Sequence, residues 1–454
     1  MQLTRIHRRP YARLAGVYDV YLCAEDAAEQ TYPALALFGQ RVRQLHRRFA
    51  PDLAERQAIL QICRLTEGSP LALELAAGAA PYYTCAQIAA DLAHGQPPAA
   101  RPMRDRPLRH QSLHASLDYS WHLLTTVEQR LLRQLAVFRG GFYDIAAQQV
   151  AGVGLAELAA LVDKSLVQLG TNPLDVERYA MHELIRQYLF EKLQAAGELN
   201  PTQQRHCHYY LALAQEAEAK LRTQEHRQVL ACLEINHDNL RAALTWALAN
   251  ACDLALALAV SLGSFWRHRG YISEGRAWLQ QALQKTATPS PLRVKALVRL
   301  GDLLGAQGER EASFTHHQAS LALARELDDQ LGIALALRSI GWYYMHLDKP
   351  RTIHYFSEAL ALLRNLGEER RIAQLLGDLA QLIFEQENDL AKTRAYLQES
   401  LHLGRKNGDA RSIMQALNVE AQLASRQGDY AEEMRLLQET LALTQMLGIK
   451  QDEA

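Results

Sequence analysis

Residues 320–360 read SLALARELDDQLGIALALRSIGWYYMHLDKPRTIHYFSEAL, and this stretch is one unit of a pattern that recurs through the second half of the chain. Its apolar residues fall at helical spacing on both sides of the turn signal Lys349-Pro350. A small residue followed by leucine opens and closes the unit, at Ser320-Leu321 and at Ala359-Leu360. Such a unit predicts two antiparallel helices that pack against each other.

This pair, a small residue followed by leucine, recurs at intervals of 38, 39, 41 and 40 residues. The small residues are Ala282, Ser320, Ala359, Ser400 and Thr440. The other helix of each unit carries a small residue at similar intervals, at Gly263, Gly301, Gly341, Ala380 and Ala421. We expect the two backbones to approach closely there, so the pattern resembles tetratricopeptide repeats. The period exceeds the usual length of about 34 residues, which predicts longer helices or linkers.

The chain divides into regions by composition and pattern. Residues 30–94 predict a helical subdomain, and the proline-rich residues 95–107 predict a linker. A second domain is expected over residues 108–196. Helical repeats are expected over residues 197–454, with less regular helical pairs at 200–250 that cap the array. The predicted fold class is therefore mostly α, ending in an α-solenoid similar to tetratricopeptide repeats.

The second domain combines helices with one β-hairpin. A capping-box pattern at Thr125 and Glu128 predicts the start of a helix. Residues 165–169 and 178–182 alternate in polarity around a turn, which predicts two paired strands. Helices followed by a hairpin are typical of a winged helix.

Bulk composition narrows the class of protein. The chain of 454 residues is 48% hydrophobic and 22% charged, with a formal net charge of -1, so no global charge attracts it to nucleic acid. Its six cysteines show no CxxC spacing, and the neighbours His206-Cys207-His208 point in different directions on a helix, so no metal site is expected. No apolar run is long enough to span a bilayer, which predicts a cytoplasmic protein without membrane partners.

Several motifs in order resemble the bacterial STAND regulators with an NB-ARC-type ATPase, of the AfsR and LuxR-related type. They are GSPLALELAA (68–77), LRHQSLHASLDYSWHLL (108–124), LLRQLAVFRGGF (131–142), LVDKSLV (161–167), RYAMHELIRQYL (178–189) and HDNLRAALTWAL (237–248). The resemblance covers the chain from about residue 30. It implies a signalling protein with ARC-like helices at 30–94, a winged helix and a repeat sensor.

The resemblance also implies residues that contact ADP. Pro70 matches the proline that packs near the adenine, and His182 matches the histidine that contacts the β-phosphate. Glu183 stands where the family has aspartate. Residues 1–29 match a remnant of the NTPase core, in which Arg5 corresponds to the arginine that senses the γ-phosphate.

A phosphate-binding loop of the form GxxxxGK[ST] occurs nowhere in the sequence. We therefore expect the C-terminal part of a STAND-type regulator without its own catalytic loop, no enzyme activity and no bound cofactor. An alternative is a switch responsive to ADP or ATP that is completed by a second, P-loop-bearing chain.

Binding of a partner remains as the main expected activity. The repeat array predicts a concave surface for a protein or peptide, and Arg299, Arg338, Tyr343 and His346 are candidate contacts. A DNA-binding transcriptional regulator is the other alternative. Its candidate recognition helix, 155–166, carries one lysine and two acidic residues, so direct DNA contact is not expected.

Overall fold

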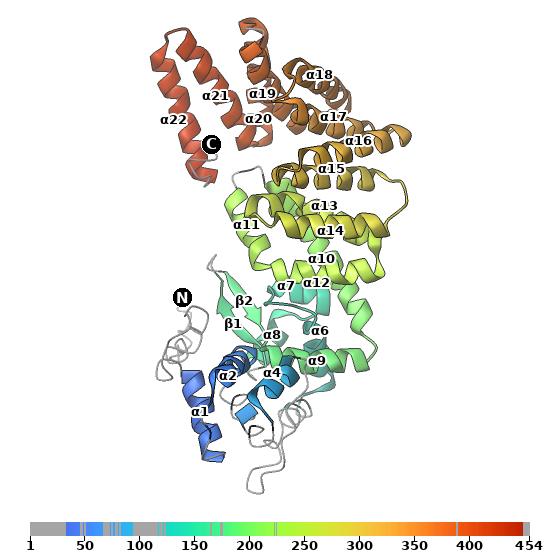
Figure 1. Cartoon of the computed structure of the whole chain (residues 1–454), viewed down its shortest axis with the longest axis vertical. Helices are drawn as coiled ribbons and strands as arrows, with labels where there is room; N and C mark the ends of the chain where they lie inside the picture. The colour runs from blue at the N-terminus through green and yellow to red at the C-terminus, as the bar shows by residue number, and fades with distance from the viewer. Residues whose placement is uncertain are drawn as a thin grey trace, which may run out of the picture. The chain divides into compact units, whose positions relative to one another are not determined.

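The computed structural model describes residues 33–45, 49, 51–66, 73, 76–77, 80, 83–93, 117, 121, 124–163, 166–172, 176–221, 223, 225–386 and 389–447. The chain forms two compact units. The N-terminal unit comprises Met1–Thr171 and Val176–Thr202, and the repeat unit comprises Asn172–Asp175 and Gln203–Ala454. Both are mostly α-helical, as predicted (Figure 1).

The N-terminal unit contains short helices and one small sheet. Its described elements are α1 (Pro33–Leu45), α2 (Leu53–Leu65), α4 (Cys85–Ala93), α6 (Thr126–Leu135), α7 (Asp144–Ala151), α8 (Leu155–Asp163), β1 (Gln168–Thr171), β2 (Glu177–Ala180) and α9 (Glu183–Ala195). The next helix, α10 (Leu199–Lys220), begins in this unit and ends in the repeat unit.

Apolar faces of α1, α2 and α4 meet in one core. Phe38 and Val42 of α1 and Ile62 of α2 are fully buried there, in agreement with the helical spacing that predicted these two helices. Leu184, at the start of α9, packs into the same core. The sequence Met181-His182-Glu183, called MHE below, leads into α9 and is therefore attached to the helical subdomain that α1, α2 and α4 form.

The predicted capping box and hairpin are both present, but the first strand lies later and the second slightly earlier than expected. Thr125 accepts a hydrogen bond from Glu128 N at 3.2 Å, while Glu128 accepts one from Thr125 N at 3.0 Å. Strand β1 pairs antiparallel with β2, with Gln168 opposite Ala180 and Thr171 opposite Glu177. The prediction that the first strand spans 165–169 was wrong at its start, because the N–H groups of Leu166 and Val167 bond to Leu161 O and close the end of α8.

The repeat unit consists of helices throughout its described part. They are the end of α10, then α11 (His226–Ile235), α12 (His237–Asn250), α13 (Cys252–Arg269), α14 (Ile272–Lys285), α15 (Pro291–Ala306), α16 (Arg310–Glu326), α17 (Gln330–Tyr344), α18 (Lys349–Leu366), α19 (Glu369–Gln386), α20 (Leu390–Asn407), α21 (Ala410–Arg426) and α22 (Tyr430–Leu447). From α13 onward they pair into five hairpins. We call α13, α15, α17, α19 and α21 the first helices. Their partners α14, α16, α18, α20 and α22 are the second helices.

The long period comes from long helices and not from long linkers. Helices α16 and α18 have 17 and 18 residues, whereas Leu327–Asp329 alone joins α16 to α17. Among the described residues, no single helix is both long and apolar enough to cross a bilayer, although Asp144–Ala151 and Leu155–Val162, bent by 107°, together meet the criteria of length and composition.

Small residues of the two helix series are buried where the pattern placed them, but the space beside the glycines is filled by side chains. A Cβ at Gly341 would lie 2.4 Å from the Phe356 ring, and one at Gly301 would lie 2.4 Å from the His317 ring. At Gly263 the neighbour is the side-chain stem of Arg299 in the next hairpin. The expected close approach of two backbones was therefore wrong at these glycines, since each makes room for a large side chain.

Buried hydroxyl groups fix the same hairpins. Thr352 donates to Gly341 O at 3.2 Å, and Ser313 donates to Gly301 O at 2.8 Å. Each of these bonds joins the start of a second helix to the glycine of its own first helix. The ring and the hydroxyl together set the distance between the paired helices.

We predict that Gly341→Ala lowers the free energy of unfolding by about 1–3 kcal/mol, because the new methyl group overlaps the Phe356 ring. Gly305→Ala is the matched control in α15, an exposed position where the nearest atom, Ser313 Oγ, lies 3.2 Å from the new Cβ. Alanine's helix propensity contributes up to about 1 kcal/mol there, and a small shift of Ser313 Oγ offsets part of it, so the net change should be much smaller than at Gly341. Urea denaturation followed by circular dichroism measures both, and equal effects at the two glycines would contradict the packing described.

Candidate functional site

A large hollow lies within the repeat unit. Its volume is about 1380 Å³, above the roughly 300–1,000 Å³ that is typical of small-molecule pockets. Its lining comes from all five first helices and from the chain around the α10–α11 junction. The hollow is therefore a product of the whole array and not of one repeat.

Two contacts hold the end of α10 beside the first helices. Arg299 of α15 forms an ion pair with Glu218 of α10. Arg370 of α19 donates to Ala219 O at 2.8 Å, across 151 positions of sequence. These contacts bring the start of the array next to helices that follow much later in the chain.

The structure separates the four residues predicted to contact a partner. Arg299 and Arg338 both line the hollow. Tyr343 and His346 do not. Tyr343 stacks on Phe314 at 4.2 Å between ring centroids and donates to Glu311 at 2.9 Å, whereas His346 is exposed beyond the end of α17. Tyr343 lies five positions after Arg338 in α17, about 140° further around the helix, so the two side chains do not share a face. His346 lies beyond the end of that helix.

Sequence reasoning missed most of the positive charge in the hollow. Eight cationic residues line it against three acidic ones, Glu218, Asp302 and Glu368; the cations are Arg267, Arg269, Lys295, Arg299, Arg338, Arg370, Arg371 and Arg411. No common step in the sequence marks these positions, since Lys295 and Arg338 precede the small residues of their own helices, Gly301 and Gly341, by six and three positions.

Charges of the same sign face one another in the hollow. Arg411 is exposed at one side and surrounded by protein at the others. Its desolvation and the nearby charges of Arg267 and Arg338 lower its pKa below the ordinary value, although the carboxylates of Asp378 and Asp409 act in the opposite direction. Desolvation lowers the pKa of His268 to about 4, with smaller contributions from His226, Arg411 and Arg267. His268 is therefore neutral at pH 7, and the positive charge resides on the arginines and on Lys295.

His182 joins two separate motifs within the N-terminal unit. Its Nδ1 accepts from Leu184 N at 3.3 Å and caps α9, so its Nε2 carries the proton and donates to Thr66 O at 3.0 Å. Thr66 ends α2, two residues before Gly68 of the GSPLAL sequence. The histidine predicted to contact a phosphate therefore already has a backbone partner on each ring nitrogen.

Glu183 is held by arginines of its own unit. Burial raises the pKa of this carboxyl, but hydrogen bonds from Arg186 and Gln187 and the charge of Arg139 outweigh burial, so the net shift is downward. Arg186 donates to both of its oxygens, at 2.7 and 2.6 Å. The acidic residue that replaces aspartate is therefore an ionised, structurally engaged group. Pro70 and Arg5, the other two predicted nucleotide contacts, lie outside the described residues.

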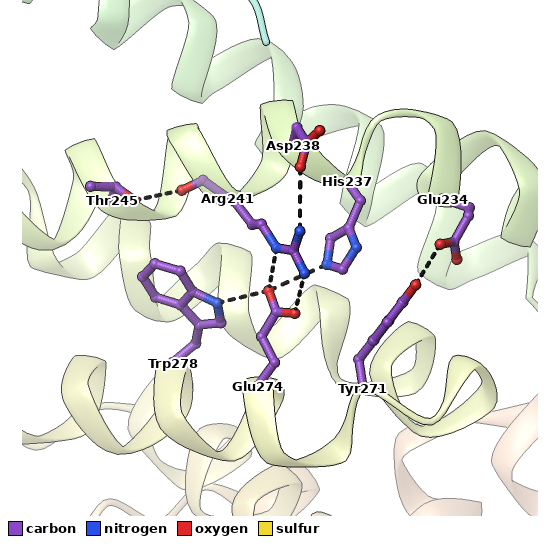
Figure 2. A network of polar contacts seen from close by, with 8 residues as sticks. All are labelled: Glu234, His237, Asp238, Arg241, Thr245, Tyr271, Glu274 and Trp278. Atoms are coloured by element: carbon purple, nitrogen blue, oxygen red, sulfur yellow. Dashed lines mark hydrogen bonds and ion pairs between the residues drawn. The ribbon is translucent and has the colours of Figure 1, made fainter. Parts of the chain in front are cut away.

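The HDNLRAALTWAL motif builds a half-buried polar cluster between α12 and α14, which Figure 2 shows. Arg241 donates to Glu274 at 2.8 and 2.6 Å, and Trp278 donates to the same carboxylate at 3.2 Å. The buried His237 ring lies 3.3 Å from that carboxylate and packs against Tyr271. The bonds of Arg241 and Trp278 to Glu274 link two helices, so we assign this cluster to the stability of the array.

Other clusters noted in the sequence carry no site in the described residues. His206 and Cys207 are buried whereas His208 is exposed, and His206 contacts Asn239 at 3.2 Å. Within the described ranges, no group of three or more His, Cys, Asp or Glu side chains is placed to hold a metal ion.

Comparisons with known proteins point to regulators. No family model matches the chain. Proteins provisionally named HTH-type transcriptional regulators, from Mycobacterium tuberculosis and from Mycobacterium bovis, are 34% identical to it over 370 residues, which is 76% of this chain. The alignment covers 41% of each relative, so the chain spans less than half the length of the curated relatives it matches.

Among solved structures, a STAND protein with a tetratricopeptide repeat sensor from Pyrococcus horikoshii is similar with a TM-score of 0.48 and 13% identity. That match covers 91% of this chain and 60% of the other. A likeness at this level carries no functional argument.

We predict that His182→Ala lowers the hydrogen-exchange protection of the first turn of α9 about tenfold, because both the cap and the bond to Thr66 are lost. His182→Asn is the control: its side chain still caps Leu184 N but is too short to replace the imidazole against Thr66. We expect the logarithm of the protection factor to fall in His182→Asn by roughly half as much as in His182→Ala. Equal protection in all three proteins would show that His182 does not hold α9.

Proposed function

We propose that this chain is a regulatory interaction module whose repeat unit binds a segment of a polypeptide partner in the hollow. One observation carries the proposal: a hollow of about 1380 Å³ is lined by all five first helices. Successive repeats build such extended concave surfaces for binding. The similarity to transcriptional regulators supports a role in signalling.

Binding fits the hollow better than catalysis. Its lining mixes aliphatic side chains, such as Val260, Leu335 and Met414, with charged ones over a large area. Enzyme sites instead gather a few polar groups around one reacting atom. We therefore propose that the chain acts by recognition and not as an enzyme on its own.

The N-terminal unit would be the element that responds. Helices α6, α7 and α8 followed by the β1–β2 hairpin, with Phe142 bridging to Tyr179, have the order of a winged helix. The exposed side chains at the start of α8 include Leu155 and Glu157, which suit phosphate contact poorly. We propose a switch element here and not a domain that reads DNA directly.

A finer proposal is that the chain corresponds to the C-terminal part of a STAND-type regulator, with ARC-like helices in its N-terminal unit. The contact between His182 and Thr66 supports it, because it joins the histidine of the MHE sequence to the residue two positions before Gly68 in the chain. A nucleotide switch would then need a phosphate-binding loop from outside this sequence. In that case ADP would replace Thr66 as the partner of His182.

Filling the hollow should abolish partner binding. We predict that peptides selected from a random display library against the chain no longer bind Gln215→Trp, in which an exposed residue of the lining becomes bulky. His346→Trp adds the same bulk to an exposed residue outside the lining and should leave binding intact. Selection of no peptides, or of peptides that bind both variants equally, would overturn the proposed site.

The chain alone should not bind nucleotide. We predict no saturable binding of a fluorescent ADP analogue up to high micromolar concentration, with or without magnesium, because no phosphate-binding loop is present in the sequence. Binding that is lost in His182→Ala would instead support the nucleotide-switch alternative.

A further inference from the structure

The hollow concentrates positive charge in a chain that is otherwise nearly neutral. Eight arginine and lysine residues line it against three acidic residues, whereas the whole chain has a formal net charge of -1. Charge of one sign in a concave surface focuses the electrostatic field and attracts groups of the opposite sign. Its chemistry therefore favours an anionic ligand.

Acidic residues near the hollow are already engaged with particular partners. Glu218 pairs with Arg299, and Glu368 accepts from Arg371 at 3.0 Å. Asp302, the third acidic residue of the lining, accepts from Ser339 at 3.4 Å. Arg269 of the lining also pairs with Glu234 at 3.3 Å. The cations that these carboxylates do not reach keep a local excess of positive charge.

Three other cations of the lining, Arg267, Lys295 and Arg411, have no ion-pair partner among the residues that the structure describes. Arg338 has only a long one: its Nη2 lies 3.8 Å from Asp378 Oδ2, while Gln415 donates to the other oxygen of that aspartate at 2.6 Å. The Nε atom of Arg338 is buried without a hydrogen-bond partner in the described part of the chain. The Arg338 side chain is 29% exposed and lines the hollow, so the rest of its guanidinium is accessible to a ligand there.

We propose that Arg267, Arg338 and Arg411, contributed by α13, α17 and α21, form an anion subsite that binds the carboxylates of an acidic segment of the polypeptide partner. This inference rests on the proposed function and names the chemistry of its ligand. The three arginines lie close enough for the charges of Arg267 and Arg338 to act on Arg411. A bound carboxylate would relieve that repulsion and receive forked N–H donors.

The lining distinguishes a polypeptide from a nucleic acid. Single-stranded nucleic acids are usually held by basic grooves with aromatic side chains on which the bases stack. No Phe, Tyr or Trp is present among the described residues that line the hollow. Aliphatic residues lie between the cations instead, among them Leu221, Val298 and Leu335, and they suit the apolar side chains of a peptide.

The test uses the full chain and a fluorescein-labelled octapeptide of leucine and glutamate, with its glutamine counterpart as the neutral probe. We expect the glutamate peptide to bind at least about tenfold more tightly at low salt, and to weaken as salt rises. Arg338→Gln and Arg411→Gln should each weaken it about fivefold or more. Arg435→Gln is the control, since Arg435 lies in α22 outside the lining and pairs with Glu432 at 2.6 Å.

A stability measurement separates binding from a structural role. Because the free chain holds like charges together, Arg411→Gln should raise the midpoint of thermal unfolding by about 1–3 °C while it weakens the peptide. A lower midpoint would show that Arg411 stabilises the fold, and would overturn its assignment to the subsite. Displacement of the peptide by a lower concentration of single-stranded RNA would also overturn the inference.

The two proposals fail in different ways. Neutral library peptides that bind the wild type but not Gln215→Trp would leave the proposed function standing and refute the anion subsite. Equal affinity for the glutamate and glutamine peptides would refute the subsite as well. If no peptide of any composition binds, both proposals are wrong.

Discussion

The repeat unit depends on one packing constraint: certain residues of the first helices must lack a side chain. At Gly341 the missing Cβ leaves the space that the Phe356 ring occupies, and at Gly301 it leaves space for His317. Hydroxyl groups of the second helices then bond to the carbonyls of the same glycines. Since closely packed interiors tolerate little overlap, these contacts fix each hairpin in one geometry.

The geometry of the hairpins leads directly to the hollow. Gly263 makes room for the stem of Arg299 from the next first helix, so the packing that brings first helices together also directs a charged side chain. Later helices also contact the end of α10: Arg370 donates a hydrogen bond to Ala219 O, and Arg299 forms an ion pair with Glu218. Residues far apart in sequence therefore contribute to one basic surface, whose like charges oppose folding and favour an anionic occupant.

In the N-terminal unit, one side chain connects two elements that are far apart in sequence. A single imidazole, that of His182, caps α9 through one ring nitrogen and bonds to the end of α2 through the other. Leu184 beside it packs into the core of α1, α2 and α4. The sequence that resembles a nucleotide sensor is thus at present a structural joint, and loss of the bond to Thr66 would free the same ring to bind another acceptor.

The sequence by itself determined the mostly helical class, the step of the repeats and the capping box at Thr125, because helical periodicity, small residues and caps are local properties of the chain. It also singled out Arg299 and Arg338, which line the hollow, while their contact with a partner stays a prediction. Only the tertiary structure decided that Tyr343 and His346 lie elsewhere, that rings fill the space beside the glycines, and that Arg267 and Arg411 act on each other across 144 positions. Those outcomes depend on how each hairpin is rotated against the next, and such rotations are set by long-range packing that no local pattern records.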